Sequence, residues 1–122
     1  MLSVSTSEKT YHHGDLRAAL LDAAIQALEA GEPFSLRAVA RRAGVSPAAP
    51  YRHFADREAL DSAVAVEGFK DLQADLAAAL DRVPAASPAP AVITQLGIAY
   101  VTFALRRPAV FRLMFGNECD ES

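Results

Sequence analysis

The stretch FSLRAVARRAGVSPAAPYRHF, residues 34–54, contains the residues that decide the fold. Ser35 is a good N-cap for a short helix over residues 36–43, whose apolar residues recur at helical spacing. Gly44 then ends this helix, because glycine readily adopts the left-handed conformation of a helix C-terminus. Val45 follows with one apolar side chain directed into the corner. The pattern predicts a helix that stops at a tight turn.

Another short helix, the third along the chain, is expected directly after this turn. Ser46 is placed to cap it, and Pro47 occupies the first helical position, where its missing N–H is harmless. Pro50 removes at most the first internal hydrogen bond of this helix and can distort its first turn. Phe54 ends the element with an aromatic side chain. Two short helices joined by a glycine-containing turn form a helix-turn-helix.

Helical spacing and punctuation predict further helices on both sides of this motif. These helices are expected at residues 15–30, 57–80, 91–106 and 109–115. The Pro-rich stretch 83–90 reads as a loop, and the helix at 91–106 is apolar nearly all round, which predicts burial between partners. No segment has the pattern of a strand, so we expect an all-α protein. The predicted core of the first three helices is Leu16, Leu20, Leu36, Val39, Val45 and Phe54.

The composition fits a folded intracellular protein, with 52% hydrophobic and 22% charged residues. Cys119 is the only cysteine, which excludes an intramolecular disulfide and argues against a cysteine-based zinc site. The first ten residues lack the apolar core of a signal peptide, and no apolar run is expected to span a membrane. We therefore expect a cytoplasmic protein.

The positive charge of the chain is local, although the net charge is -3. Residues 37–57 contain five arginines and one acidic residue, a net charge of +4. The residues after Arg57 contain five basic and nine acidic residues, a net charge of -4. A basic segment beside an acidic body is typical of a DNA-binding head on a regulatory body.

A basic helix-turn-helix predicts binding to duplex DNA. Its first helix braces the motif, and its second offers its N-terminal end to the major groove, which is wide enough for a helix. The alternative is an ordinary helical hairpin in a small all-α protein. The clustering of arginines on this hairpin favours the DNA-binding interpretation.

The stretch FSLRAVARRAGVSPAAPYRHFADREAL, residues 34–60, resembles the signature of the TetR family of repressors. The shared features run from a Thr or Ser opening the second helix, through Ala-Gly-Val-Ser at the turn, to Tyr-x-x-Phe ending the third. The preceding YHHGDLRAALLDAA, residues 11–24, resembles the family's first helix. The later YVTFALRRPAVFRLMF, residues 100–115, resembles more weakly a motif in the ligand-binding region of one TetR subgroup.

The resemblance implies an all-helical regulator that binds a palindromic operator as a homodimer and is released by a small apolar ligand. It implies a helix-turn-helix DNA-binding domain at residues 11–56, then a long connecting helix and an incomplete helical regulatory domain within residues 57–122. Family members continue with two long helices that form a dimeric four-helix bundle, whereas this chain ends before them. We therefore expect it either to dimerise through the surface around Tyr100, Phe103, Val110 and Phe111 or to bind DNA weakly.

The candidate DNA-contacting residues are Ser35, Arg37, Ser46, Pro47, Ala48, Ala49, Tyr51, Arg52, His53 and Arg57. Arg37 is the candidate base reader, since Arg can engage guanine O6 and N7 together; a phosphate contact is an equal alternative. Tyr51 matches the family's phosphate-contacting tyrosine, with a half-buried aromatic as the alternative. Arg57 stands where the family has Lys and, with the N–H groups that begin the fourth helix, could hold a phosphate.

The remaining candidates divide into polar and apolar residues. Ser35 could hold a phosphate at the start of the second helix in the same way, with simple capping as the alternative. His53 resembles a family position near the DNA backbone, with capping of the third helix as the alternative. Ser46 and Arg52 are polar candidates, whereas Arg41 and Arg42 are expected to be solvated or near the DNA backbone. The tip Pro47-Ala48-Ala49-Pro50 carries no hydrogen-bonding side chain, so it can touch thymine methyl groups or allow close backbone approach.

No other chemistry is expected. His12 and His13 are adjacent on a loop and lack a supporting Cys or carboxylate cluster, so we do not expect them to bind a metal. Ser46, His53 and Asp56 are the residue types of a catalytic triad, but no glycine-rich elbow accompanies them. We expect no enzyme activity, no metal and no cofactor. The alternative function is a helical ligand-binding or protein-interaction module without DNA binding.

Overall fold

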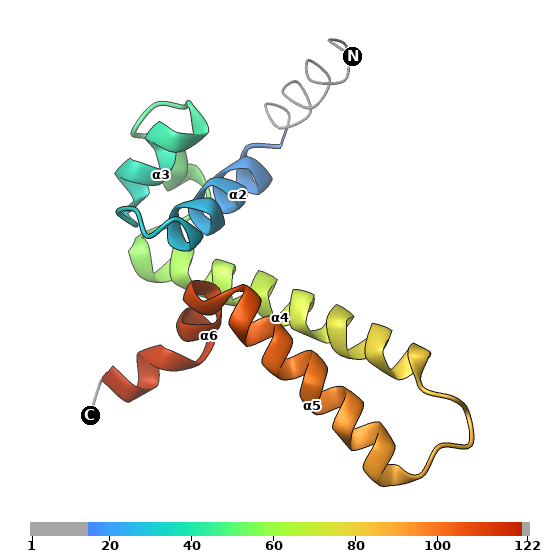
Figure 1. Ribbon diagram of the computed structural model, residues 1–122. Coiled ribbons are helices and arrows are strands. Elements are labelled where there is room, and N and C mark those ends of the chain that lie inside the picture. The colour runs from blue at the N-terminus through green and yellow to red at the C-terminus, as the bar shows by residue number, and fades with distance from the viewer. Residues whose placement is uncertain (1–14, 121–122) are drawn as a thin grey trace. The chain divides into compact units, whose positions relative to one another are not determined.

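The computed structural model describes residues 15–120, with side chains to Gly116, and every regular element among them is helical (Figure 1). The elements are α2 (Leu16–Glu29), α3 (Leu36–Ala43), a 3₁₀-helix η1 (Ala49–Arg52), α4 (Arg57–Arg82), α5 (Ala89–Arg106) and α6 (Pro108–Asp120). The all-α prediction is confirmed. The chain divides into two compact units, Met1–Ala63 (unit 1) and Val64–Ser122 (unit 2). The functional boundaries expected at 11–56 and 57–122 stay a prediction.

Side-chain caps fix where the helices of unit 1 begin. The Asp15 carboxylate accepts the N–H of Ala18 at 3.2 Å, and the Ser35 hydroxyl accepts the N–H of Ala38 at 3.0 Å. Asp56 does the same at the start of α4, 2.9 Å from the N–H of Ala59. Each cap satisfies one of the N–H groups that the first turn of a helix leaves without a partner.

Two glycines end α2 and α3 in the same way. Gly31 and Gly44 have φ of +71° and +77°, the left-handed region that favours glycine. After Gly44, the N–H of Val45 donates to the Ala40 carbonyl at 3.0 Å, which closes the last turn of α3. The predicted tight turn between the two elements of the motif is therefore present.

The third element differs from the predicted helix. It is a single 3₁₀ turn, Ala49–Arg52, preceded by Ala48 with no side-chain cap, so Ser46 does not cap it as expected. In an α-helix the Pro50 nitrogen would have to donate to the Ser46 carbonyl, and its ring would collide with that group. Instead the N–H of Ala49 reaches the Ser46 carbonyl at 3.1 Å. The proline thus tightens the chain into a 3₁₀ turn.

The core of unit 1 contains four of the six residues predicted for it. Leu20, Leu36, Val39 and Phe54 are buried, and Ala49, Pro50 and Leu60 join them. Leu16 and Val45 are only half-buried, which corrects the prediction for both. Leu16 opens the first turn of α2, and Val45 directly follows the turn glycine, so each lies at the edge of the packed region.

Unit 2 is held together by aromatic packing and by one close helix contact. Phe103 and Val110 are fully buried, and the ring of Phe111 lies 5.8 Å from that of Tyr100 and 4.9 Å from that of Phe115. A Cβ built on Gly68 in α4 would lie 2.9 Å from a methyl of Val110 and 2.6 Å from the sulfur of Met114. The missing side chain of Gly68 therefore lets α6 approach α4 closely.

Helix α5 is mostly exposed, contrary to the predicted burial. Phe103 is its only buried residue. Ile93, Ile98, Val101 and Leu105 are between 54% and 77% exposed. An apolar helix composition indicates that a partner is needed, and the described part of the chain does not supply one for this face. Ala89–Arg106 also has the length and mean hydropathy of a minimal membrane span, a criterion that core helices of soluble proteins meet as well.

Candidate nucleic-acid interface

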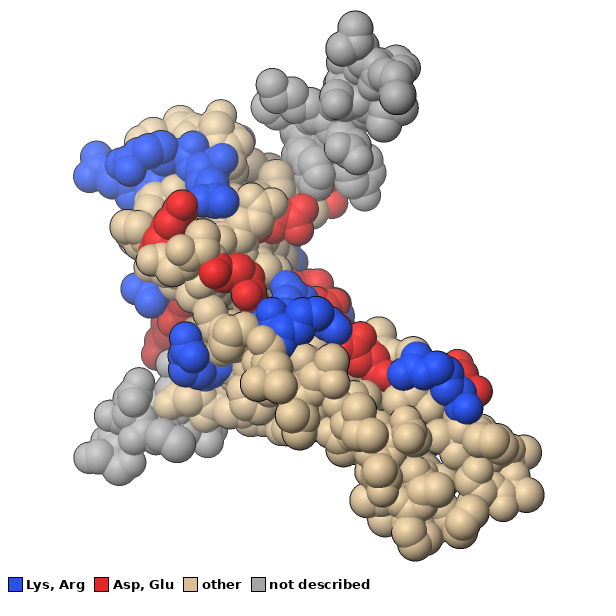
Figure 2. Space-filling view, viewed as in Figure 1, with Lys and Arg blue, Asp and Glu red and all other residues tan. Residues whose placement is uncertain are grey.

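Helix α3 has a buried inner face and a basic outer face. Leu36, Val39 and Ala40 are buried in unit 1, which fixes the helix to its neighbours. Arg37 lies between these positions in the sequence, Arg41 directly follows them, and both are exposed. Figure 2 shows Lys and Arg side chains gathered over the α3 end of unit 1. The helix that braces the motif thus also carries charge on its surface.

The arginines of this region fall into two groups. Arg37, Arg41 and Arg52 are exposed, and none has an ion-pair partner within residues 15–116. Arg42 is engaged: its guanidinium pairs with Glu32 and donates to the Gln26 amide oxygen at 3.3 Å. Arg42 therefore ties the end of α3 to α2 and the following loop, a role that its sequence position alone does not indicate.

Arg57 is positioned at the start of α4 by two contacts. Its guanidinium lies 4.7 Å from the centre of the Phe34 ring and 3.2 Å from an Asp61 oxygen. The side chain is still 58% exposed, so it can reach a phosphate. The carboxylates of Asp56 before the helix, Glu58 in its first turn and Asp61 one turn further on offset part of its charge. These neighbouring carboxylates weaken the attraction of Arg57 for an anion.

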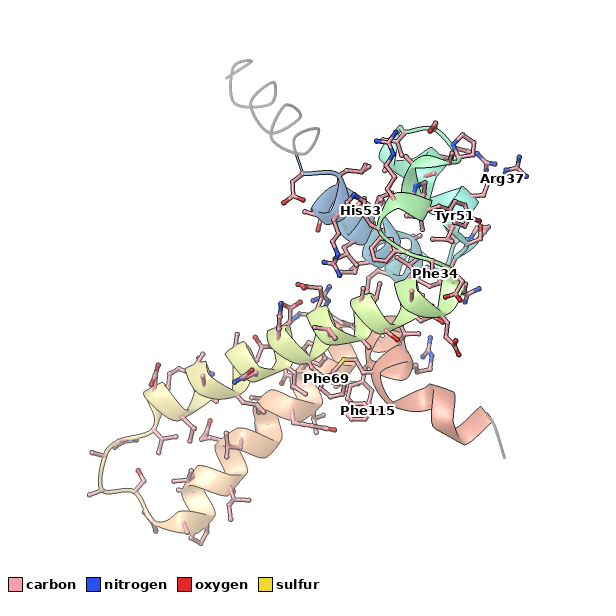
Figure 3. All side chains as sticks on the ribbon, turned by 180° about the vertical axis from the view of Figure 1, so that it is seen from behind. Phe34, Arg37, Tyr51, His53, Phe69 and Phe115 are labelled. Atoms are coloured by element: carbon pink, nitrogen blue, oxygen red, sulfur yellow. The ribbon has the colours of Figure 1, made fainter. Side chains whose placement is uncertain are left out.

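Tyr51 is an exposed aromatic residue in the described part of unit 1. It is 60% exposed although it belongs to η1, whose Ala49 and Pro50 are buried. Figure 3 shows Tyr51 and Arg37 at the same outer edge of unit 1. An exposed phenol there can donate a hydrogen bond to a phosphate oxygen. The alternative of a half-buried aromatic does not fit this exposure.

The tip residues separate into exposed and buried ones. Ser46, Pro47 and Ala48 are exposed, as are Arg52 and His53, whose ring lies 6.4 Å from that of Phe54. Ala49 is only 8% exposed, so its side chain packs inside unit 1 and has almost no surface to offer DNA. The Ser35 hydroxyl is occupied as the cap of α3, which leaves its lone pairs only partly available.

Sequence reasoning missed Arg17 as a residue that supports the motif. Its guanidinium lies 5.4 Å from the centre of the Phe54 ring and is exposed on α2. No spacing rule links residues 17 and 54, so only the folded arrangement reveals this pair. No group of three or more His, Cys, Asp or Glu able to hold a metal ion occurs in the described part of the chain. His12 and His13 lie outside the described residues.

Comparison with known proteins places this geometry in a family context. Residues 20–64 match the family model for bacterial regulatory proteins of the tetR family. An uncharacterized HTH-type transcriptional regulator of Haemophilus influenzae is 35% identical over 109 residues, which cover 87% of this chain and 52% of that protein. A solved structure from Rhodococcus sp. RHA1, of unknown function, is 46% identical with a TM-score of 0.75, covering 88% of this chain and 56% of that one. The chain spans about half the length of both relatives.

Proposed function

Because residues 20–64 make this chain a member of the tetR family of bacterial regulatory proteins, we propose that it binds duplex DNA through α3 and η1 and so regulates transcription. One observation carries the proposal. Exposed arginines without partners in the described structure lie on a helix whose other face is fixed in a packed core. Nucleic-acid affinity comes largely from cationic side chains meeting phosphates, and rigid placement sets the register of those contacts.

The proposed contacts come from three places in unit 1. Arg37 and Ser35 act from α3, and Arg57 with the start of α4 holds a phosphate. The tip and η1 supply the rest: Ser46, Pro47, Ala48, Tyr51, Arg52 and His53. Ala49 is left out because it is buried. In this arrangement Tyr51 and Arg57 anchor the backbone, whereas Arg37 and the tip face the major groove.

We further propose that the regulator is a cytoplasmic homodimer that represses from a palindromic operator. A single DNA-binding module of this kind buries only about 600–1,000 Å² of its own surface against DNA. Two modules on one duplex therefore give a larger interface. The surface expected earlier for dimerisation needs correction, because Phe103 and Val110 are fully buried in unit 2. Sedimentation of the purified chain tests this step; a concentration-independent monomer that binds a palindrome tightly contradicts it.

Release by a small molecule is the last part of the proposal. A groove of about 630 Å³ in unit 2 supports it, lined by Arg82, Val83, Pro84, Ser87, Pro90, Ala91, Thr94 and Gln95. Its size lies in the range of small-molecule sites. Its lining mixes polar and apolar groups, so the ligand need not be purely apolar as first expected. A compound that lowers DNA affinity and loses this effect in an Arg82→Ala variant supports the proposal; a compound that releases both proteins equally argues against this groove.

Selection of bound sequences from random duplex DNA by the full chain tests DNA binding directly. We expect enrichment of one short motif, and an Arg37→Ala variant should enrich it with one base position relaxed if Arg37 reads a guanine. Recovery of random sequence without affinity above that for the starting pool contradicts the proposal. That outcome favours the alternative of a protein-interaction module, for which the exposed apolar residues of α5 are the supporting observation.

A further inference from the structure

The exposed part of the tip, Pro47-Ala48-Ala49-Pro50, carries no hydrogen-bonding side chain. Between Ser46 and Tyr51, the residues at the surface are Pro47 and Ala48, while Ala49 and Pro50 are buried. A proline ring and a methyl group cannot bond to the donor and acceptor atoms of a base edge. Whatever these two residues recognise has to be apolar.

Part of the tip's backbone is committed to its own turn. The Ser46 carbonyl accepts the N–H of Ala49 at 3.1 Å, and the Ala48 carbonyl accepts the N–H of Tyr51 at 3.2 Å. Pro47 has no N–H to donate. These bonds occupy two of the tip's backbone carbonyls, and the side chains of Pro47 and Ala48 can offer a base edge only apolar contact.

The major groove displays one apolar group, the C5-methyl of thymine. We infer that Ala48, with Pro47 beside it, reads a thymine methyl group in each half-site of the operator. Ala48 suits this contact because its side chain is exposed and adds no polar atom that would need a partner. Its own backbone is unstrained, with φ of -82° and ψ of -20°. The inference rests on the proposed DNA binding and adds the chemistry of one base position.

Deoxyuridine provides a direct test, because it lacks only this methyl group. The full chain is first used to select a bound sequence, and each thymine of one half-site is then replaced singly by deoxyuridine. Burying one methyl group corresponds to about 0.8 kcal/mol, which is about a fourfold change in affinity. We expect one thymine whose replacement weakens binding about fourfold. At that position, a duplex with 5-methylcytosine should bind more tightly than the same duplex with cytosine.

The Ala48→Gly variant tests whether Ala48 is the residue that contacts the thymine methyl group. In this variant the thymine and deoxyuridine duplexes should bind equally. Ala30→Gly is the matched control, because Ala30 is also exposed and has similar backbone angles, φ of -83° and ψ of -5°. It should therefore keep the fourfold discrimination while carrying a similar glycine penalty in stability.

The outcomes separate this inference from the proposed function. If no single deoxyuridine weakens binding while the selected duplex is still bound, the methyl reading is wrong and DNA binding stands. If Ala48→Gly retains the discrimination, another residue reads the methyl group and the assignment to Ala48 fails. If no sequence is selected at all and binding does not depend on salt, the proposed function itself fails and the inference fails with it.

Discussion

Substitutions at two arginines of α3 should have opposite effects. Comparing them separates a contribution to DNA affinity from a contribution to the stability of the fold. Arg37 is exposed and has no ion-pair partner among the residues that the structure describes. Arg42 is bonded to both Glu32 and Gln26. Each is changed to Ala in the full chain. Since the helix propensity of Ala is at least as high as that of Arg, neither substitution should destabilise α3 by lowering its helix propensity.

The Arg37→Ala variant should lose affinity for DNA and keep its stability. If Arg37 reads a guanine, the loss is about 1–3 kcal/mol, or about 5- to 150-fold, on the selected sequence only. If it meets a phosphate, the loss is alike on all sequences and the slope of log K against log salt falls by about 0.9. Either way the melting temperature should stay within about 2 °C, because a surface side chain without packing contributes little.

The Arg42→Ala variant should show the reverse. The side chains of its ion pair are partly exposed, 34% for Arg42 and 51% for Glu32. Solvent screening therefore reduces the contribution of the pair to the free energy of unfolding to about 0–1 kcal/mol. For a domain of this size the melting temperature should fall by up to about 8 °C. Affinity for DNA should change much less than in Arg37→Ala.

Fluorescence anisotropy on labelled duplexes at two salt concentrations and circular dichroism melts measure both effects. Equal loss of affinity in the two variants, with unchanged melting, would refute the division of the arginines into a binding group and a structural one. Unchanged affinity in Arg37→Ala would remove Arg37 from the interface.

The remaining predictions concern backbone, packing and anchoring. Gly44→Ala should destabilise unit 1 by about 1–2 kcal/mol in urea unfolding, because a Cβ meets nothing within 4 Å and only the left-handed φ is strained; unchanged stability would show that the turn relaxes. Gly97→Ala should stabilise α5 by about 0.5–1 kcal/mol, since this position is open, whereas Gly68→Ala should destabilise by about 1 kcal/mol because overpacking exceeds the gain in helix propensity. Equal shifts for the two would contradict the close contact at Gly68. Tyr51→Phe should weaken binding to all sequences alike without changing the melt, and a sequence-dependent loss would assign Tyr51 to base reading.

Local chemistry made much of unit 1 predictable. Ser35 caps its helix as expected, and Gly44 forms the left-handed turn. These features depend on residues three or four apart, so sequence spacing carries them. The order of the elements, and the α-helical type of every one except η1, followed from the same short-range patterns.

The features that sequence did not predict depend on competition or on distant partners. Pro47 suits the start of either an α-helix or a 3₁₀ turn, and the collision of Pro50 with the carbonyl four residues earlier decides between them. Arg42 finds its partners 10 and 16 residues away, which no helical spacing indicates. The apolar surface of α5 shows that composition can signal a need for burial without naming what provides it.

The dependence of DNA affinity on salt tests the central claim most directly. The full chain is titrated against its selected duplex and against random duplex of equal length, between about 50 and 200 mM salt. With Arg52 and Arg57 available to phosphates, log K should fall linearly with log salt, with a slope of about -2 for each bound head, or about -3 if Arg37 also meets a phosphate. The selected duplex should bind more tightly than the random one throughout. Affinity that is independent of salt, or equal and negligible for both duplexes, would contradict the proposal that this helix-turn-helix binds DNA.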